Sequence, residues 1–263
     1  MRYLVFIKAG LLTVFMYRAS AIFMSLTNLL YIVIIFFLWR AIYDGSDGLI
    51  KGLSFDQAFV YLALASTFVA IYGTGTEWKV SNTIISGDII NELIKPIDYQ
   101  MMLFFYSLSQ VVYLLFWVGT PVILLVSFVG GLDVVVVERL PLFLMSLCFA
   151  YGISFHIDYL IGVTAFQTQS VWGFIAVKES LIFVLSGAVV PLAFFPESVQ
   201  SILAFTPFAY IYNTPLILLT DASVPFSRCL EYLAIQAAWV FGLIAVARGY
   251  FHVSIQRLMI NGG

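Results

Sequence analysis

Long apolar runs, separated by short polar steps, form the main pattern along this chain. Residues 19–39, for example, lie between Arg18 and Arg40 and contain no charged side chain. A helix needs about 20 mostly apolar residues to cross the hydrocarbon core of a bilayer. The runs of sufficient length predict six transmembrane helices, at residues 19–40, 57–76, 102–129, 140–165, 171–191 and 230–250.

The pattern inside the runs decides between helices and the strands of a membrane barrel. Barrel strands alternate apolar and polar residues over about ten positions. Runs such as Tyr31–Leu38 do not alternate. The sequence therefore predicts an all-α membrane protein, with residues 1–263 forming a single transmembrane domain.

The stretch 191–226 is apolar but repeatedly interrupted by proline, at Pro191, Pro196, Pro207, Pro215 and Pro225. Non-helical backbone persists at membrane depth only where protein or water satisfies its polar groups. We expect short re-entrant helices on the outer side of the membrane, before the last span. A seventh span over residues 202–219 is the alternative, and it would move the C-terminus across the membrane.

Residues 1–18 precede the first predicted span and carry Lys8 and Arg18. Because a Lys or Arg at the bilayer centre costs about 2.5–3.5 kcal/mol, we expect an interfacial helix on the inner leaflet. The segment has few polar residues to form a polar face, so packing against other helices of the chain explains it equally well.

Composition supports a chain surrounded by lipid. Of 263 residues, 62% are hydrophobic and only 10% charged, and the mean hydropathy is +1.04. Soluble domains carry about 25% charged residues, which coat their surface. The net charge of −2 argues against a nucleic-acid partner. Cys148 and Cys229 are expected to be buried free thiols, and neither a disulfide nor a metal site is expected.

The distribution of Lys and Arg near the span ends predicts the orientation. With six spans and the N-terminus inside, the inner side holds Arg2, Lys8, Arg18, Lys79, Lys95, Arg248 and Arg257, and the outer side holds Arg40, Lys51, Arg139 and Arg228. This bias favours cytoplasmic N- and C-termini.

The most polar stretch of the chain, residues 81–98, predicts a short amphipathic helix in an inner loop. Gly87 can cap its start, and Asp88 lies in the first turn, where the helix dipole favours an acidic group. Lys95 lies in the last turn, and Pro96 ends the helix.

One side of this short helix is apolar. Its apolar positions at helical spacing are Ile89, Ile90, Leu93 and Ile94, with Glu92 between them. An exposed apolar stripe of this kind fits a groove in a partner. A helix that rests on lipid headgroups or on its own bundle would show the same pattern, and the residues alone leave both interpretations open.

Ionisable residues inside a span are candidates for function, and the fourth span contains His156 and Asp158. Two positions apart on a helix, they face different directions. Asp158 shares a face with Ser154 and Gly162, and it could attract a cationic substrate. A hydrogen bond or ion pair to another span is the favoured alternative. His156 is read as a packed histidine rather than a proton relay.

The fifth span begins with two charges, Lys178 and Glu179, which could contact a partner or each other across a dimer. The sequence lacks the phosphate-binding pattern G-x-x-x-x-G-K-[ST]. The glycine cluster at 73–76 is interpreted as helix termination or close helix packing. No catalytic constellation is visible, so the chain is not expected to be an enzyme.

Two segments carry a family resemblance. They are ISGDIINELIKPID, in the inner loop, and SGAVVPLAFFPESVQSILAFTPFAY, before the last span. Together with the layout of the spans, they resemble the ABC-2 type permeases, and more narrowly the compact six-span permeases of bacterial ABC exporters. Gly87–Pro96 resembles the coupling helix of that family. Gly187–Pro196 resembles the segment that enters its extracellular re-entrant helices, which implies an outer gate region at Pro191, Phe195, Pro196 and Glu197.

The resemblance implies a function. The chain would be the permease subunit of an ATP-driven exporter in a bacterial inner membrane, paired with an identical or related permease. Separate ABC ATPase subunits would bind ATP and Mg²⁺ and dock on residues 87–96, so no cofactor is expected in this chain. An ion-driven secondary transporter is the main rival, although no internal repeat relates residues 1–130 to 131–263. A membrane enzyme and a scaffold are further rivals.

Overall fold

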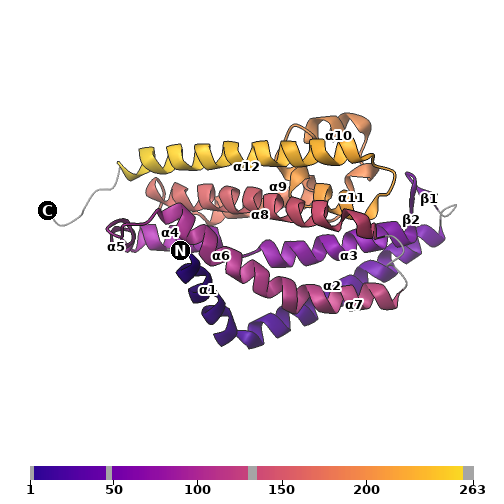
Figure 1. Ribbon diagram of the computed structural model, residues 1–263, viewed down its shortest axis with the longest axis horizontal. Coiled ribbons are helices and arrows are strands. Elements are labelled where there is room, and N and C mark those ends of the chain that lie inside the picture. The colour runs from indigo at the N-terminus through magenta and orange to yellow at the C-terminus, as the bar shows by residue number, and fades with distance from the viewer. Residues whose placement is uncertain (1–2, 46–48, 130–134, 257–263) are drawn as a thin grey trace.

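The computed structural model describes residues 3–45, 49–129 and 135–256. Most of the long helices run side by side along one axis (Figure 1). The helices are α1 (Leu4–Met16), α2 (Arg18–Asp44), α3 (Phe55–Tyr72), α4 (Thr76–Ile85), α5 (Ile89–Leu93), α6 (Tyr99–Leu114), α7 (Thr120–Phe128), α8 (Leu140–Val163), α9 (Trp172–Leu185), α10 (Glu197–Leu203), α11 (Asn213–Thr220) and α12 (Phe226–Ile255). A hairpin of β1 (Leu49–Ile50) and β2 (Leu53–Ser54) joins α2 to α3. Arg2 and Arg257, counted above for the orientation, lie outside the described residues.

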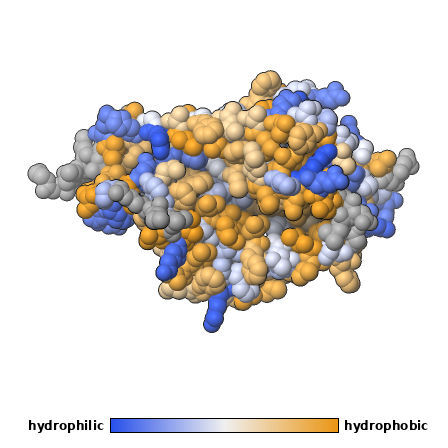
Figure 2. Space-filling view, in the orientation of Figure 1, coloured by the Kyte–Doolittle hydropathy of each residue, from blue (hydrophilic) through white to orange (hydrophobic). Residues whose placement is uncertain are grey.

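Five helical stretches of the described chain are long and apolar enough to cross a membrane: Arg18–Asp44, Phe55–Ile85, Tyr99–Phe128, Val137–Phe166 and Phe226–Ile255. Figure 2 shows apolar side chains across the middle of the molecule, with polar side chains gathered mainly at the two ends of the long axis. These features confirm the predicted all-α membrane protein.

The predicted span at residues 171–191 is the exception, because its helix, α9, ends at Leu185. At 1.5 Å per residue α9 is about 21 Å long, shorter than the roughly 30 Å hydrocarbon core. The helix ends at Leu185 because Gly187, with a φ of +81°, and then Pro191 follow it. Five helices, rather than the predicted six, therefore reach spanning length within the described residues.

The stretch 191–226 folds as short helices, as its prolines predict. It contains α10, of seven residues, and α11, of eight residues. The alternative of a single span over residues 202–219 is wrong, because α10 ends at Leu203 and α11 begins at Asn213. Figure 1 places α10 and α11 at the same end of the bundle as the β1–β2 hairpin. The side of the membrane that this end faces stays a prediction.

The N-terminal helix α1 packs against α6. An added Cβ at Gly10 would collide with the Ser109 side chain, so the glycine permits the close approach of the two helices. Lys8 and Arg18 remain exposed on the surface. The structure thus supports the packing interpretation of this segment.

The third stretch combines α6 and α7 through a π-helical turn at Leu115–Gly119. Pro121 has no N–H to donate to the carbonyl of Trp117, four residues earlier. Ser25 of α2 donates to that carbonyl instead, over 3.1 Å. The proline therefore opens a backbone acceptor that ties this stretch to α2.

Helix α8 lies at the centre of the bundle and packs against α4, α11 and α12. Gln236 of α12, which is fully buried, accepts from Ser146 Oγ of α8 over 2.8 Å and donates to the Tyr210 carbonyl over 2.9 Å. This amide joins the last span to α8 and to the segment that precedes α11.

Candidate functional site

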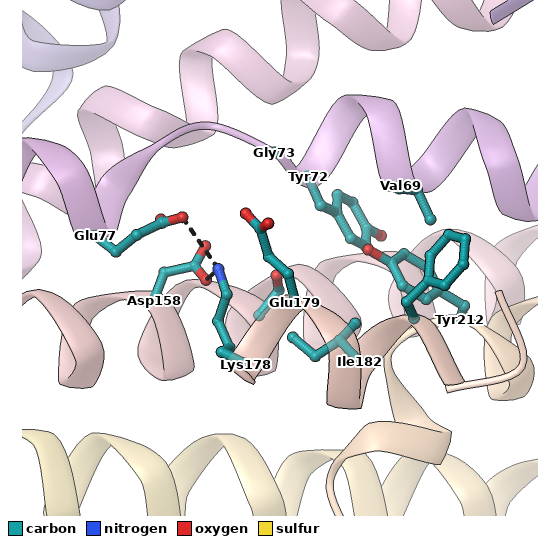
Figure 3. Close-up of a pocket in the computed structure, with 11 residues that line it drawn as sticks. Val69, Tyr72, Gly73, Glu77, Asp158, Lys178, Glu179, Ile182 and Tyr212 are labelled. Carbon is teal, nitrogen blue, oxygen red and sulfur yellow. Dashed lines mark hydrogen bonds and ion pairs between the residues drawn. The ribbon is translucent and has the colours of Figure 1, made fainter. Parts of the chain in front are cut away.

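The second apolar stretch is broken between α3 and α4, at the glycine cluster 73–76, where the sequence left helix termination and close helix packing as alternatives. Gly75 has a φ of +65°, in the left-handed region that glycine adopts without strain. Helix α4 then restarts at Thr76. The break places Glu77 in the first turn of α4, on the side that faces α8 and α9 (Figure 3).

Glu77 forms a buried ion triad with one residue from each of two other helices. Lys178 Nζ of α9 lies 3.1 Å from Glu77 Oε1 and 2.8 Å from Asp158 Oδ1 of α8. The residues are 4% (Glu77), 4% (Asp158) and 9% (Lys178) exposed. A buried charge is costly without a partner, so the triad ties three helices together at this depth.

The triad leaves acidic charge in excess. Two carboxylates face one ammonium group, and Glu77 Oε2 is buried without a hydrogen-bond partner. Glu179, the next residue on α9, is exposed and forms no ion pair among the described residues. Figure 3 shows its carboxylate directed toward the space between Glu77 and Tyr72.

This space is a cavity of about 230 Å³. Its acidic end is formed by Glu77, Asp158 and Glu179, and its other end by aromatic and aliphatic side chains, among them Tyr72 and Tyr212. The rings of these two tyrosines stack with centroids 5.8 Å apart. The cavity therefore combines negative charge with aromatic faces.

A second cavity, of about 470 Å³, adjoins the first and shares Val69 and Phe183 with it. It lies between α2, α3 and the region around α9, and its walls are mostly apolar. Asn28 is the notable polar residue in these walls, because it is buried and its Oδ1 has no hydrogen-bond partner.

Asp158 and His156 have different surroundings, as their spacing predicts. Asp158 pairs with Lys178, which is the ion pair to another helix that the sequence favoured. His156 Nδ1 lies 2.6 Å from the Gly152 carbonyl, and its ring packs against Phe104. His156 does not line the cavity beside Asp158.

The expectation for Lys178 needs correction. The sequence suggested that Lys178 could contact a partner or Glu179 across a dimer, but its ammonium is buried in ion pairs within its own chain. Glu179 alone of the two remains available on the surface.

The predicted coupling segment lies at the other end of α4. Gly87, at φ +82°, separates α4 from α5. Ser86 Oγ donates to Asp88 Oδ2 over 2.8 Å, and Lys95 Nζ lies 2.6 Å from Glu92 Oε2. The helix itself ends at Leu93, earlier than predicted.

The apolar stripe of this segment is divided between two environments. Ile89 is fully buried and belongs to the main hydrophobic core of the chain. Ile90 and Leu93 are exposed, and Ile94 is 77% exposed. Ile89 therefore anchors α5 to its own bundle, while the other three residues remain free at the surface together with Pro96.

The predicted outer gate residues lie between α9 and the first turn of α10. Pro191 is buried, and the Phe195 carbonyl accepts from Gln200 Nε2 over 2.9 Å. Pro196 precedes α10, whose first residue is the exposed Glu197. Their role in gating stays a prediction.

Sequence reasoning missed Glu77 and Lys178 as partners of Asp158. Glu77 was read as the boundary of a span, because a charge normally ends an apolar run. Lys178 lay inside the fifth run and received no partner. The signal was available, since a lysine and an aspartate inside apolar runs each require an opposite charge.

Neither thiols nor metal ligands form a site among the described residues. Cys229 is buried as expected, but Cys148 is exposed on the surface of α8, which corrects that expectation. No group of three or more His, Cys, Asp or Glu side chains that could hold a metal ion occurs in this part of the chain.

Comparison with known families gives one match. The model of a family described as ABC-2 family transporter protein matches residues 29–262, which is most of the chain. No curated protein matches this sequence.

Proposed function

Because this chain belongs to the ABC-2 family of transporter proteins and is a permease subunit of an ABC transporter, we propose that it exports a substrate as part of a dimer. Two separate ABC ATPase subunits, which bind ATP and Mg²⁺, drive the export. The second permease chain is identical or related, and the membrane is the inner membrane of a bacterium.

The observation that carries this proposal is the exposed apolar surface of Ile90, Leu93 and Ile94 at one end of the bundle. These residues lie beside the Glu92–Lys95 ion pair, in the most polar loop of the chain. Apolar side chains on a short helix outside the apolar spans are suited to a groove in a partner. We assign that groove to the ATPase subunit, and we place this end in the cytoplasm with both termini.

Helix α4 supplies a mechanical link from this surface to the buried triad. It is a single helix of ten residues, about 15 Å long, bounded by Gly75 and Gly87, each with positive φ. Glu77 lies in its first turn, and the exposed residues Ile90, Leu93 and Ile94 follow its C-terminal end. A displacement of α5 by the ATPase would therefore move Glu77 relative to Lys178 and Asp158.

The exposed face of α9 supports the dimer. Trp172, Phe174, Val177 and Leu181 are exposed on this helix, and Glu179 is exposed at the opening of the smaller cavity. An opening lined by a carboxylate is costly to place against lipid tails, so it needs a protein or aqueous neighbour. The second permease chain supplies this cover, and the export pathway lies between the two chains.

An ion-driven transporter remains the second candidate, because transporters of that class bind substrate at broken helices within the membrane. The break at Gly73–Gly75 beside the ion triad is such a feature. The family match favours ATP as the energy source.

Co-purification tests the choice between them. The tagged chain is extracted from native membranes in a mild detergent, and its partners are identified by mass spectrometry. Leu93→Asp places a charge in the proposed apolar contact and should abolish recovery of the ATPase. Asn91→Asp is the matched control, because it adds the same charge to an exposed polar position of α5 and should preserve recovery. An undiminished yield of ATPase with Leu93→Asp would disprove the docking assignment, and a chain recovered without any ATPase would favour the ion-driven candidate.

A further inference from the structure

The two adjoining cavities differ in chemistry in a way that describes a ligand. The smaller cavity, of about 230 Å³, contains three carboxylates and a single buried lysine. The larger, of about 470 Å³, is mostly apolar. Val69 and Phe183 form part of both, so the two cavities adjoin.

The charges of the smaller cavity favour a cation. Lys178 is already shared by Glu77 and Asp158, which leaves Glu179 without an ion pair among the described residues. Figure 3 shows the Glu179 carboxylate directed into the cavity, on the side where Tyr72 lies. A cation beside a carboxylate and over an aromatic face gains energy from both.

The cation is organic rather than a metal ion. The carboxylates do not converge as a set of three or more ligands, since no such group of His, Cys, Asp or Glu side chains that could hold a metal ion occurs among the described residues. Aromatic and aliphatic walls also fill the space next to them, which a bare ion would leave empty. Sites for small molecules have this composition, with apolar walls and a few polar groups that fix the orientation.

Buried polar atoms without partners provide an independent indication of a ligand. Asn28, in the wall of the larger cavity, is nine-tenths buried, and its Oδ1 accepts no hydrogen bond. Glu77, in the wall of the smaller cavity, has an unpartnered Oε2. A buried acceptor without a donor is unfavourable, so each cavity has a polar group that a bound molecule could satisfy after a small side-chain rearrangement.

We propose that the joined cavities bind an amphipathic amine, with its ammonium group beside Glu179 and Tyr72 and its apolar body against Val69, Phe183 and Ala70. This inference rests on the proposed transport function, because it names the class of substrate that the permease carries. Glu179 is the residue that contacts the ammonium group, and Asp158 and Glu77 add negative charge behind it.

Ligand binding can be measured without the ATPase. The purified permease is placed in nanodiscs of phosphatidylcholine, a lipid without net charge, and titrated with dansylcadaverine. This probe joins an apolar fluorophore to a primary ammonium group, and its N-acetyl derivative is the matched probe without the charge. Fluorescence enhancement, corrected with empty nanodiscs, should show saturable binding that is about tenfold tighter for the charged probe.

Three variants separate the contributions of charge and cavity. Glu179→Gln should remove the preference for the charged probe, because the two probes then meet the same uncharged group. Glu138→Gln is the control, since Glu138 is also exposed but does not line either cavity. Ala70→Phe fills the larger cavity and should weaken both probes about tenfold, whether or not they are charged.

Equal binding of the two probes to the unaltered protein would overturn the inference, as would a full charge preference in Glu179→Gln. Glu179 makes no ion pair among the described residues, so its substitution leaves the triad intact. The binding result is independent of the co-purification result. Loss of the ATPase interaction would refute ATP-driven export alone, and loss of probe binding would refute the amine site alone.

Discussion

Glu77 of α4 and Asp158 of α8 share the ammonium group of a single lysine, Lys178 of α9. The three residues come from separate helices. Lys178 is 101 positions from Glu77 and 20 positions from Asp158 in the sequence. Their meeting point lies at the break between α3 and α4, where the chain has no regular helix to hold its own backbone. The ion triad therefore stabilises the weakest point of the second apolar stretch.

Removal of Lys178 should destabilise the protein. Lys178→Met leaves two buried carboxylates without a cation, and we expect a loss of about 3–5 kcal/mol in stability. The triple variant Glu77→Gln, Asp158→Asn, Lys178→Met removes every charge and should recover most of that loss. Thermal stability of the purified protein, followed by size-exclusion chromatography, measures both. Equal stability of Lys178→Met and the unaltered protein would show that the triad does not contribute to the stability of the fold.

Helix α4 should be equally sensitive where it crosses α8. An added Cβ at Gly162 would lie 2.6 Å from Val80 Cβ and 3.0 Å from the Glu77 carbonyl oxygen. Gly162→Ala should therefore push α4 away from α8 and cost about 1–3 kcal/mol. The measurement is the thermal midpoint of the purified protein.

Two further variants interpret that result. Val80→Ala in the Gly162→Ala background removes the contact with Val80 Cγ1 at 2.9 Å, keeps the one with Val80 Cβ, and should restore a small part of the stability. Gly242→Ala is the control, because a Cβ there meets no atom within 4 Å and the position is inside helix α12. A loss of stability as large in Gly242→Ala as in Gly162→Ala would show that close packing of α4 on α8 is not the cause.

The sequence predicted the helices of this fold well because each long apolar run has few ways to satisfy its backbone in lipid. It also predicted the broken stretch after Pro191, since proline acts locally, but at Gly73–Thr76 it left helix termination and close helix packing as alternatives and ended the span there, whereas the stretch continues to Ile85. It overestimated α9, because the apolar run continues to Pro191 while the helix ends at Leu185. Hydropathy reports which residues avoid water, but it does not report where a helix stops.

The candidate site was predicted only in part, for a different physical reason. Asp158 stood out because an acid within a span requires an explanation. Its partners could not be assigned, since Lys178 and Glu77 reach it only through the packing of three helices. The sequence also could not show which apolar residues of the predicted coupling segment are buried. Ile89 and Ile90 are neighbours in the sequence, but only Ile89 packs into the core.

The orientation of the chain can be tested with single cysteines in a background that lacks Cys148 and Cys229. Asn91→Cys and Ser223→Cys place exposed thiols at opposite ends of the bundle. With cytoplasmic termini, a membrane-impermeant maleimide added to intact spheroplasts should label Cys at 223 fully and Cys at 91 only after the membrane is opened. The reverse pattern would invert the topology and move the proposed ATPase contact to the outer side.

Arg139 should hold the segment between α11 and α12 in place. Its guanidinium donates to the carbonyls of Asp221, Ala222 and Val224, over 2.5, 3.0 and 2.5 Å. Three carbonyls in different directions require the fixed fork of an arginine, and a lysine offers a single nitrogen. Arg139→Lys should therefore loosen residues 221–224 nearly as much as Arg139→Ala does, although it keeps the charge. Limited proteolysis of the protein in nanodiscs, with cleavage sites mapped by mass spectrometry, should show faster cutting there in both variants.

Arg228 provides the control for this experiment. It lies a few residues further along the chain, on the first turn of α12, and pairs with Glu231 on the exposed surface over 2.6 Å. Because an exposed ion pair contributes about 0–1 kcal/mol, Arg228→Ala should leave cleavage at 221–224 unchanged. If Arg139→Lys were as resistant to protease as the unaltered protein, charge rather than the three directed hydrogen bonds would be what holds the segment. This end of the bundle would then tolerate either basic residue, and its geometry would depend on α11 packing against α8 instead.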